Sequence, residues 1–321
     1  MIKIFRGILF SLALCVPVQL SIAGAASAQE NTESTTPISV EWSPFMTPET
    51  LNVFKMISPQ TQIIDIRAEK YVKNGTIPGA VWIPFPQWRQ PSDRPGQPLI
   101  EEDMAKLLGD AGIRLDRPIV VYNHSGRTVQ TGRSAIAYWV LKTAGAEQLA
   151  ILNGGFKAWR ADGLPEAATP ATMPSVTLSI EYDHQHWADP VDIFAVTTGQ
   201  KKGAILDARL DAQVRKSMET GKPMMSMPLA QYIPSSFFTN YLSAKNMSAP
   251  AQQEFLADLK ERGVDVNGGM LISVCQTGEL SALAWFYASE IIGIENVRYY
   301  PDALRGWQND GGRMFGMKAV L

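Results

Sequence analysis

The sequence predicts an α/β fold in which a parallel sheet with helices on both faces is built twice. Three observations support this prediction. Short apolar strand patterns alternate with longer helical patterns, which is typical of parallel sheets whose strands are connected by helices. A set of motifs occurs twice in the same order. The length of 321 residues also suits two domains of about 150 residues each.

The first repeated motif is an apolar strand that ends in Asp-x-Arg and is followed by an apolar turn. It is Asp65-x-Arg67 in "QIIDIRAEKYVKNGTIPGAVWIPF" and Asp207-x-Arg209 in "AILDARLDAQVR", where "YIPSSFF" repeats the turn. The second copy is longer because it contains "METGKPMMSMPLAQ", which is rich in Gly, Pro and Met. We expect this insertion to be a loop.

The second repeated motif is an apolar strand, a polar turn and a helix that opens with Ser-Ala. It occurs in "PIVVYNHSGRTVQTGRSAIAYWVLKTAG" and again in "MLISVCQTGELSALAWFYASEIIG". In each copy a further strand and a short helix follow, and these end at Trp159 and Trp307. An internal duplication explains all of these matches together.

The N-terminal residues have the pattern of a secretory signal peptide. Lys3 and Arg6 precede a short apolar run, and the small residues Ala26-Ser27-Ala28 supply a cleavage site. A membrane anchor is the alternative, but Pro17 and Gln19 interrupt the apolar run, which leaves it short of the roughly 20 residues needed to span a bilayer. We expect cleavage after Ala28 and a soluble mature protein that is periplasmic or secreted.

These patterns together predict five segments. They are a signal peptide (1–28), a flexible N-terminus (29–40), a first domain (41–165), a Pro/Ala/Thr-rich linker (166–188) and a second domain (189–321). With 29 Lys and Arg against 31 Asp and Glu, the chain has no basic excess that would favour a nucleic-acid partner.

Cys275 is placed where parallel-sheet proteins bind ligands. It follows an apolar strand, and ligands of such folds sit beyond the carboxyl ends of the strands. Once Cys15 is removed with the signal peptide, Cys275 has no intrachain disulfide partner in an oxidising compartment. Asn123 takes the same place in the first copy, and its amide cannot act as a nucleophile.

These motifs resemble those of the tandem rhodanese-like sulfurtransferases, a family that uses thiosulfate or 3-mercaptopyruvate. The resemblance runs from about Thr47 to Trp307, and two copies of an ordered motif set carry it. The carriers are Asp65-x-Arg67, Thr76 to Ala80, Asn153-Gly154-Gly155-Phe156-x-x-Trp159, Asp207-x-Arg209 and the loop Cys275 to Leu280 followed by Ser281-Ala282. The resemblance implies a catalytic second domain and a non-catalytic first domain.

The resemblance further implies that Cys275 carries a sulfane sulfur as a persulfide, between a small-molecule donor and a thiol or cyanide acceptor. We expect the six residues from Cys275 to form a turn whose backbone N–H groups lower the pKa of the thiol, with Ser281 opening the helix. The candidate loop and substrate residues are Gln276, Thr277, Gly278, Glu279, Leu280, Arg209 and Arg215, with Asp207 and Ser281 in support. Asp207 and Arg209 are also candidates for a purely structural role beside the loop.

Two features bear on the donor. Tyr232 to Ser236 replace the family's usual His-Ile-Pro-Gly-Ala turn, and Glu279 adds a negative charge to the loop. A carboxylate beside the incoming anion would oppose thiosulfate, so we expect weak turnover of that donor.

Two other functions stay open at this stage. One is a non-catalytic binding or persulfide-carrier module. The other is a cysteine phosphatase or arsenate reductase, which would need an arginine in the loop, whereas no Lys or Arg occurs from Gln276 through Val297. His184 and His186 alone are too few for a metal site, so no metal and no cofactor are expected. The oligomeric state is left open.

Overall fold

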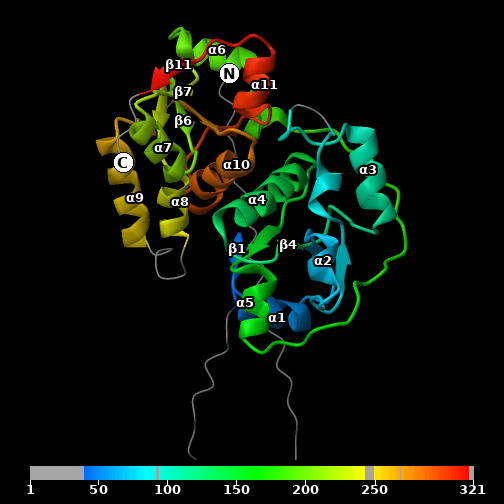
Figure 1. Ribbon diagram of the computed structural model, residues 1–321. Coiled ribbons are helices and arrows are strands. Elements are labelled where there is room, and N and C mark those ends of the chain that lie inside the picture. The colour runs from blue at the N-terminus through cyan, green and yellow to red at the C-terminus, as the bar shows by residue number, and fades with distance from the viewer. Residues whose placement is uncertain (1–39, 92–93, 243–248, 268, 318–321) are drawn as a thin grey trace, which may run out of the picture. The chain divides into compact units, whose positions relative to one another are not determined.

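Two parallel sheets form the framework of the protein (Figure 1). The structure, a computed structural model, describes residues 40–91, 94–242, 249–267 and 269–317. The predicted signal peptide and nearly all of the predicted flexible N-terminus lie outside the described residues. The predicted domain and linker boundaries stay predictions.

The first sheet has five strands, in the order β1-β5-β4-β2-β3. All of its pairings are parallel. The strands are β1 (Phe45–Met46), β5 (Leu149–Leu152), β4 (Ile119–Tyr122), β2 (Gln62–Asp65) and β3 (Ala80–Trp82).

Helices cover both faces of this sheet because successive strand residues point in opposite directions. Ile63 of β2 is buried in a core with α1 and α5, whereas Ile64 is buried with α3 and α4. These helices are α1 (Pro48–Ile57), α5 (Gly155–Ala161), α3 (Glu101–Asp110) and α4 (Thr128–Thr143), and the shorter elements are α2 (Glu69–Val72) and η1 (Phe85–Trp88).

The second sheet has four parallel strands in the order β10-β9-β6-β8. They are β10 (Val297–Tyr299), β9 (Met270–Val274), β6 (Gly203–Asp207) and β8 (Ala230–Tyr232). This order repeats β5-β4-β2-β3 of the first sheet in chain sequence. Each strand of the second sheet therefore has a counterpart in the first.

Helices also lie on both faces of the second sheet. Ile205 of β6 is buried with α6 and α11, and its neighbour Leu206 is buried with α8, α9 and α10. The helices are α6 (Pro190–Thr197), α11 (Ala303–Asn309), α8 (Ser235–Tyr241), α9 (Ala249–Glu261) and α10 (Glu279–Phe286), while α7 (Asp211–Thr220) and η2 (His184–His186) lie in connections. The predicted fold class, α/β with two parallel sheets covered by helices on both faces, is confirmed.

The two halves share one hydrophobic core. Helix α4 of the first half packs along α10 of the second (Figure 1). The rings of Tyr138 and Phe286 meet edge to face at 5.0 Å. Lys142 Nζ also lies 3.0 Å from Glu290 in η4 (Tyr287–Ile291), a π-helical turn that continues α10. The site at the start of α10 is therefore built against the first half.

The prediction that "METGKPMMSMPLAQ" forms a loop is wrong. This stretch begins within α7 and contains β7 (Met224–Ser226), which pairs antiparallel with β11 (Phe315–Met317). The pairing partner lies near the end of the chain, so no local pattern reveals the strand. The side chain of Ser226 also donates a hydrogen bond of 2.6 Å to Asp207 Oδ2, which ties the segment to the second sheet.

Candidate active site

The Cys275 thiol lies at the carboxyl end of β9, inside the second sheet. β9 is flanked by β10 and β6, and Val274 pairs with Asp207 at the end of β6. Only 1% of Cys275 is exposed. The sulfur atom is therefore held at the ligand-binding edge of the sheet and covered by protein.

Two groups contact the sulfur, one in the loop and one in the first turn of the helix that follows. The Gly278 N–H donates to Cys275 Sγ at 3.1 Å, and the Ser281 hydroxyl lies 3.3 Å from the same atom. Gly278 has a φ of +99°, a conformation that residues with a side chain rarely adopt. A glycine at this position therefore allows the loop to turn so that its N–H reaches the sulfur.

The helix begins earlier than the sequence suggested. α10 starts at Glu279 rather than at Ser281, so the turn is shorter than the six residues expected. Ser281 is fully buried in the first turn of the helix, and its hydroxyl also lies 3.1 Å from the Gly278 carbonyl oxygen. The serine therefore points back at the loop instead of capping the helix.

Burial changes the expected acidity of the thiol. Loss of solvent raises the pKa of Cys275, and the nearby Glu279 charge raises it further. Hydrogen bonds from Ser281 and from the backbone of Thr277 lower it in part. The expectation of a lowered pKa is therefore wrong for this closed arrangement, because desolvation of the thiolate outweighs the loop donors.

Glu279 is bound to groups on both halves of the chain. Its carboxylate accepts a hydrogen bond of 2.7 Å from the Thr277 hydroxyl, and it lies 3.7 Å from Arg89 and 3.9 Å from Arg133. Gly132 of α4 faces the Glu279 backbone so closely that a Cβ there would clash. The negative charge that Glu279 adds to the loop is thus paired with two arginines of the first half.

The remaining loop residues differ in exposure. Gln276 and Thr277 are partly exposed, whereas Leu280 is buried. Gln276 and Thr277 are therefore the loop side chains that a ligand from solvent meets first.

Asp207 and Arg209 form a buried pair beside the site. Arg209 Nε donates to Asp207 Oδ1 at 2.9 Å, and Arg209 Nη2 donates to Asp207 Oδ2 at 2.6 Å. Nη2 also donates to the Met225 carbonyl oxygen. Arg67 and Asp65 make the same bidentate contact in the first half. These contacts favour the structural role for both residues. Arg215 lies exposed on α7, and none of the described hydrogen bonds or ion pairs joins it to the Cys275 loop.

The equivalent loop of the first half is filled by its own side chains. Asn123 Oδ1 accepts the His124 N–H at 2.8 Å, and Gln130 Oε1 accepts both the N–H and the hydroxyl of Ser125. The His124 ring stacks on Tyr71 at 4.0 Å. The N–H groups of His124 and Ser125 are therefore satisfied internally.

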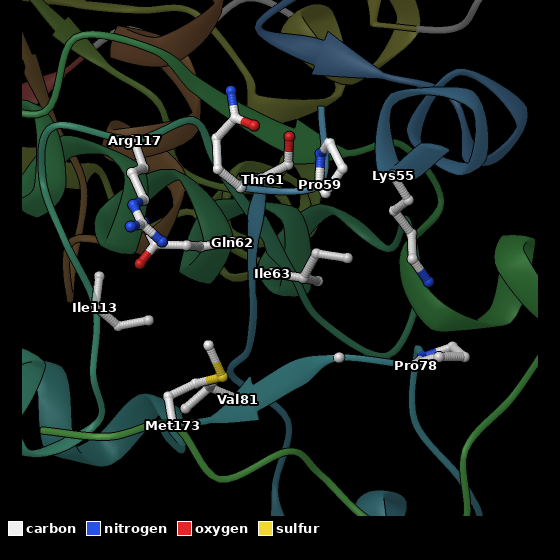
Figure 2. Close-up of a pocket in the computed structure, with 12 residues that line it drawn as sticks. Lys55, Pro59, Thr61, Gln62, Ile63, Pro78, Val81, Ile113, Arg117 and Met173 are labelled. Carbon is white, nitrogen blue, oxygen red and sulfur yellow. The ribbon is translucent and has the colours of Figure 1, made fainter. Parts of the chain in front are cut away.

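A cavity of about 220 Å³ lies at the amino ends of the strands in the first sheet, whereas Cys275 lies at the carboxyl end of a strand in the second sheet (Figure 2). Gln62 and Ile63 at the start of β2 line it, together with Lys55 and Arg117. Burial lowers the pKa of Lys55. Because this cavity is at the amino end of the strands, it is not part of the cysteine site.

Two structural features are absent from the described ranges. No group of three or more His, Cys, Asp or Glu side chains there is arranged to hold a metal ion. No helix within those ranges has the length and apolar character needed to cross a membrane.

Sequence reasoning missed two residues of the site. Arg89 contacts Glu279 from the first half, and Tyr299 lies against the loop from the end of β10. Arg89 lies outside the repeated motifs, and Tyr299 lies in the short strand that follows the second copy, where no residue pattern marks it as part of the site. The sequence places both far from Cys275, so only the folded chain brings them to the loop.

Comparison with known proteins supports the fold and the predicted class. Residues 53–162 match the family described as rhodanese-like domain. A protein of Mycobacterium tuberculosis, provisionally named thiosulfate sulfurtransferase, is 27% identical over 209 residues, which is 62% of this chain and 71% of that protein. The sulfur carrier protein TtuD of Thermus thermophilus is 23% identical over 261 residues, covering 78% of this chain and 89% of that protein.

A solved structure has the same fold. The Escherichia coli protein SseA, described with the 3-mercaptopyruvate sulfotransferases, superposes with a TM-score of 0.67 at 23% identity, covering 81% of this chain and 98% of SseA. The chain has a rhodanese fold, and the match to the rhodanese-like domain family lies in its first half. The names of its relatives support the predicted enzyme class, a rhodanese-like sulfurtransferase.

Proposed function

We propose that the protein is a sulfurtransferase that moves a sulfane sulfur from a small donor to a thiophilic acceptor through a persulfide on Cys275. The observation that carries the proposal is the position of Cys275 Sγ, which accepts the Gly278 N–H at 3.1 Å and lies 3.3 Å from the Ser281 hydroxyl. A loop that offers donors to one sulfur atom can stabilise a thiolate during attack.

The chemistry takes two exchange steps. In the first, the Cys275 thiolate forms a bond to the outer sulfur of the donor, and the donor fragment leaves with the electron pair of its broken sulfur bond. In the second, the acceptor attacks the transferred sulfur, and Cys275 leaves as a thiolate. The cysteine is therefore restored after each cycle, and ping-pong kinetics are expected.

The charged groups around the loop suit an anionic donor such as thiosulfate or 3-mercaptopyruvate. Arg89 and Arg133 approach the loop from the first half, and one carboxylate, Glu279, lies between them. Arginine side chains attract such anions and are partly screened here by Glu279. The names of the relatives also point to donors of this kind.

The test is to look for the intermediate. The protein is incubated with thiosulfate, 3-mercaptopyruvate or polysulfide, and intact mass together with peptide mapping shows whether Cys275 gains one sulfur atom. Cyanide or a thiol is then added. Gain and subsequent loss of that sulfur support the proposal, whereas the absence of any added sulfur with all three donors overturns it.

A persulfide carrier is the second candidate, because the thiol is almost fully covered. Cys275 is 1% exposed and burial raises its pKa, which favours slow exchange with small acceptors. The relative TtuD is named as a sulfur carrier. A carrier would load Cys275 but discharge it to cyanide or small thiols far more slowly than it loads. A cysteine phosphatase is disfavoured because the loop sequence contains no arginine.

The sequence also supports export. Lys3 and Arg6, the following apolar run and Ala26 to Ala28 have the order of a cleaved signal peptide. We propose a periplasmic or secreted mature protein. This part of the chain lies outside the described residues.

A further inference from the structure

Tyr299 places a hydroxyl group against the cysteine loop. It is the last residue of β10, the strand that pairs with β9 ahead of Cys275. Its side chain is fully buried, and its ring meets the Trp139 ring edge to face at 4.9 Å. The ring is therefore held by packing, and the hydroxyl has a fixed position.

The hydroxyl lies beside Gly278, whose N–H contacts the sulfur. A Cβ added to Gly278 would lie 2.5 Å from Tyr299 Oη, and a Cβ on Gly96 would clash with the same oxygen. Absence of side chains at both glycines lets the loop and the first half close around this oxygen. Tyr299 Oη thus borders the loop that holds Cys275 Sγ.

No hydrogen-bond partner of Tyr299 Oη is found among the described residues. A buried hydroxyl without a partner is uncommon and destabilising, so it calls for an explanation. Burial and the nearby charges of Cys275 and Glu279 raise the pKa of Tyr299 well above its usual range. The group therefore stays protonated and keeps its O–H available to donate.

We propose that the Tyr299 hydroxyl donates a hydrogen bond to the outer sulfur of the Cys275 persulfide. The inference depends on the proposed function. A persulfide extends about 2.05 Å beyond Sγ, and its outer sulfur carries the negative charge after loading. Tyr299 provides a donor beside the loop where that charge forms, and the proton stays on the tyrosine.

The hydrogen bond has a chemical consequence for the second exchange step. During discharge the acceptor's lone pair forms a bond to the outer sulfur, and the S–S electron pair moves to Sγ. A donor on the outer sulfur withdraws negative charge from it and makes it a better electrophile. Tyr299 is not expected to change the reactivity of the free thiol, because no hydrogen bond joins Tyr299 Oη to Sγ in the described structure.

Tyr299→Phe tests the proposal, and Tyr300→Phe is the matched control. Tyr300 is also fully buried with an unpartnered hydroxyl among the described residues, but its ring lies in the core on the other face of the second sheet. Each substitution removes one oxygen and leaves the ring, so both variants are expected to fold, as urea unfolding checks.

Three rates are compared in wild type and both variants: alkylation of the free thiol, loading by polysulfide, and discharge of the loaded persulfide to cyanide. In Tyr299→Phe, discharge should slow about tenfold while alkylation stays within about twofold of wild type. Tyr300→Phe should match wild type in all three. The inference alone is overturned if Tyr299→Phe discharges its persulfide at the wild-type rate. It is also overturned if alkylation of Tyr299→Phe slows as much as its discharge, or if discharge of Tyr300→Phe slows as much as that of Tyr299→Phe. A wild-type protein that never loads overturns the proposed function as well.

Discussion

Arg89 of the first half lies 3.7 Å from the Glu279 carboxylate, beside the cysteine loop of the second half. Arg133 approaches the same carboxylate oxygen at 3.9 Å. The carboxylate is nearly buried, whereas both arginines are partly exposed. Glu279 thus holds two cations at the loop and partly cancels their charge, which is a different role from simple repulsion of an anionic donor.

The first prediction is that Glu279→Gln lowers the Michaelis constant for thiosulfate. The substitution keeps the shape of the side chain and removes one negative charge, so Arg89 and Arg133 attract the dianion more strongly. We expect a decrease of about three- to tenfold at low salt that shrinks as salt screens the charges. Steady-state kinetics at several ionic strengths measure it.

Glu290→Gln is the matched control for this prediction. Glu290 lies further along the same helical segment and pairs with Lys142 of α4 at 3.0 Å. Replacement of Glu290 should leave the Michaelis constant for thiosulfate unchanged. An unaltered or raised constant in Glu279→Gln would show that the arginines do not face the donor.

The second prediction is that Cys275→Ser abolishes sulfur transfer and leaves the fold intact. Serine is small and polar, so it can keep the Gly278 N–H contact, but it cannot form a persulfide. Transfer should fall below about 1% of wild type, since removal of a covalent nucleophile costs several orders of magnitude. Intact mass measures persulfide formation, a turnover assay measures sulfur transfer, and circular dichroism measures the fold.

Asn123→Ala is the control, because Asn123 occupies the corresponding position of the first half. It should retain wild-type turnover. Transfer by Cys275→Ser above about 1% of the wild-type rate would disprove the persulfide mechanism.

The third prediction concerns pH. Burial raises the pKa of Cys275, so the reactive thiolate is a small fraction at neutral pH. The loading rate should rise about tenfold per pH unit below the raised pKa. Loading by 3-mercaptopyruvate, followed by intact mass from pH 6 to 10, measures the profile. A rate that is already constant from pH 6 to 8 would contradict a raised pKa.

The same shift links the thiol to stability. The folded state favours the neutral thiol, so this contribution is complete below the ordinary thiol pKa and is lost as pH rises through the raised value. Other groups also titrate at alkaline pH, so the quantity to measure is the difference in the free energy of unfolding between wild type and Cys275→Ser. The stability of wild type relative to Cys275→Ser should fall between pH 8 and 10.

Much of the fold follows from local sequence patterns. Buried parallel strands are nearly continuous apolar runs, as in "PIVVY" and "MLISV", and these runs predict strands that have helices on both faces. Asp-x-Arg follows such a strand twice, and in the structure both pairs form the same bidentate contact. The position of Cys275 at a strand end follows from the same reasoning.

The rest depends on contacts between distant parts of the chain. Arg89 meets Glu279 only when α4 packs along α10, and β7 forms only when β11 returns beside it. The raised pKa of Cys275 cannot be read from the sequence for a related reason. The loop donors can be read from the sequence, but the burial that outweighs them is set by the whole fold.

The fourth prediction is that the mature protein begins near Gln29. The residues before it have the order of a cleaved signal peptide, and they lie outside the described part of the chain. N-terminal mass analysis of protein from the exporting host measures the processed end. An intact Met1, or a lipidated Cys15 on membrane-bound protein, would contradict export as a soluble protein.

The last prediction is that Ser281→Ala raises the pKa of Cys275 further. The Ser281 hydroxyl lies 3.3 Å from Sγ and 3.1 Å from the Gly278 carbonyl, and its one proton serves one acceptor at a time. It can donate to the carbonyl beside a neutral thiol and to sulfur once the thiolate forms. Removal of this donor should slow loading about three- to tenfold at pH 7, and the deficit should vanish at a pH where the thiolate predominates.

Ser134→Ala is the matched control, because Ser134 stands in the Ser-Ala pair of the first copy and its buried hydroxyl bonds only to the Gln130 carbonyl in the described structure. The rate of iodoacetamide alkylation against pH gives the pKa of Cys275 directly in both variants. It should move to higher pH in Ser281→Ala and stay in place in Ser134→Ala. If neither profile moves, the serine does not hold the thiolate. If both move equally, the effect comes from packing between α4 and α10 rather than from the hydroxyl at the sulfur.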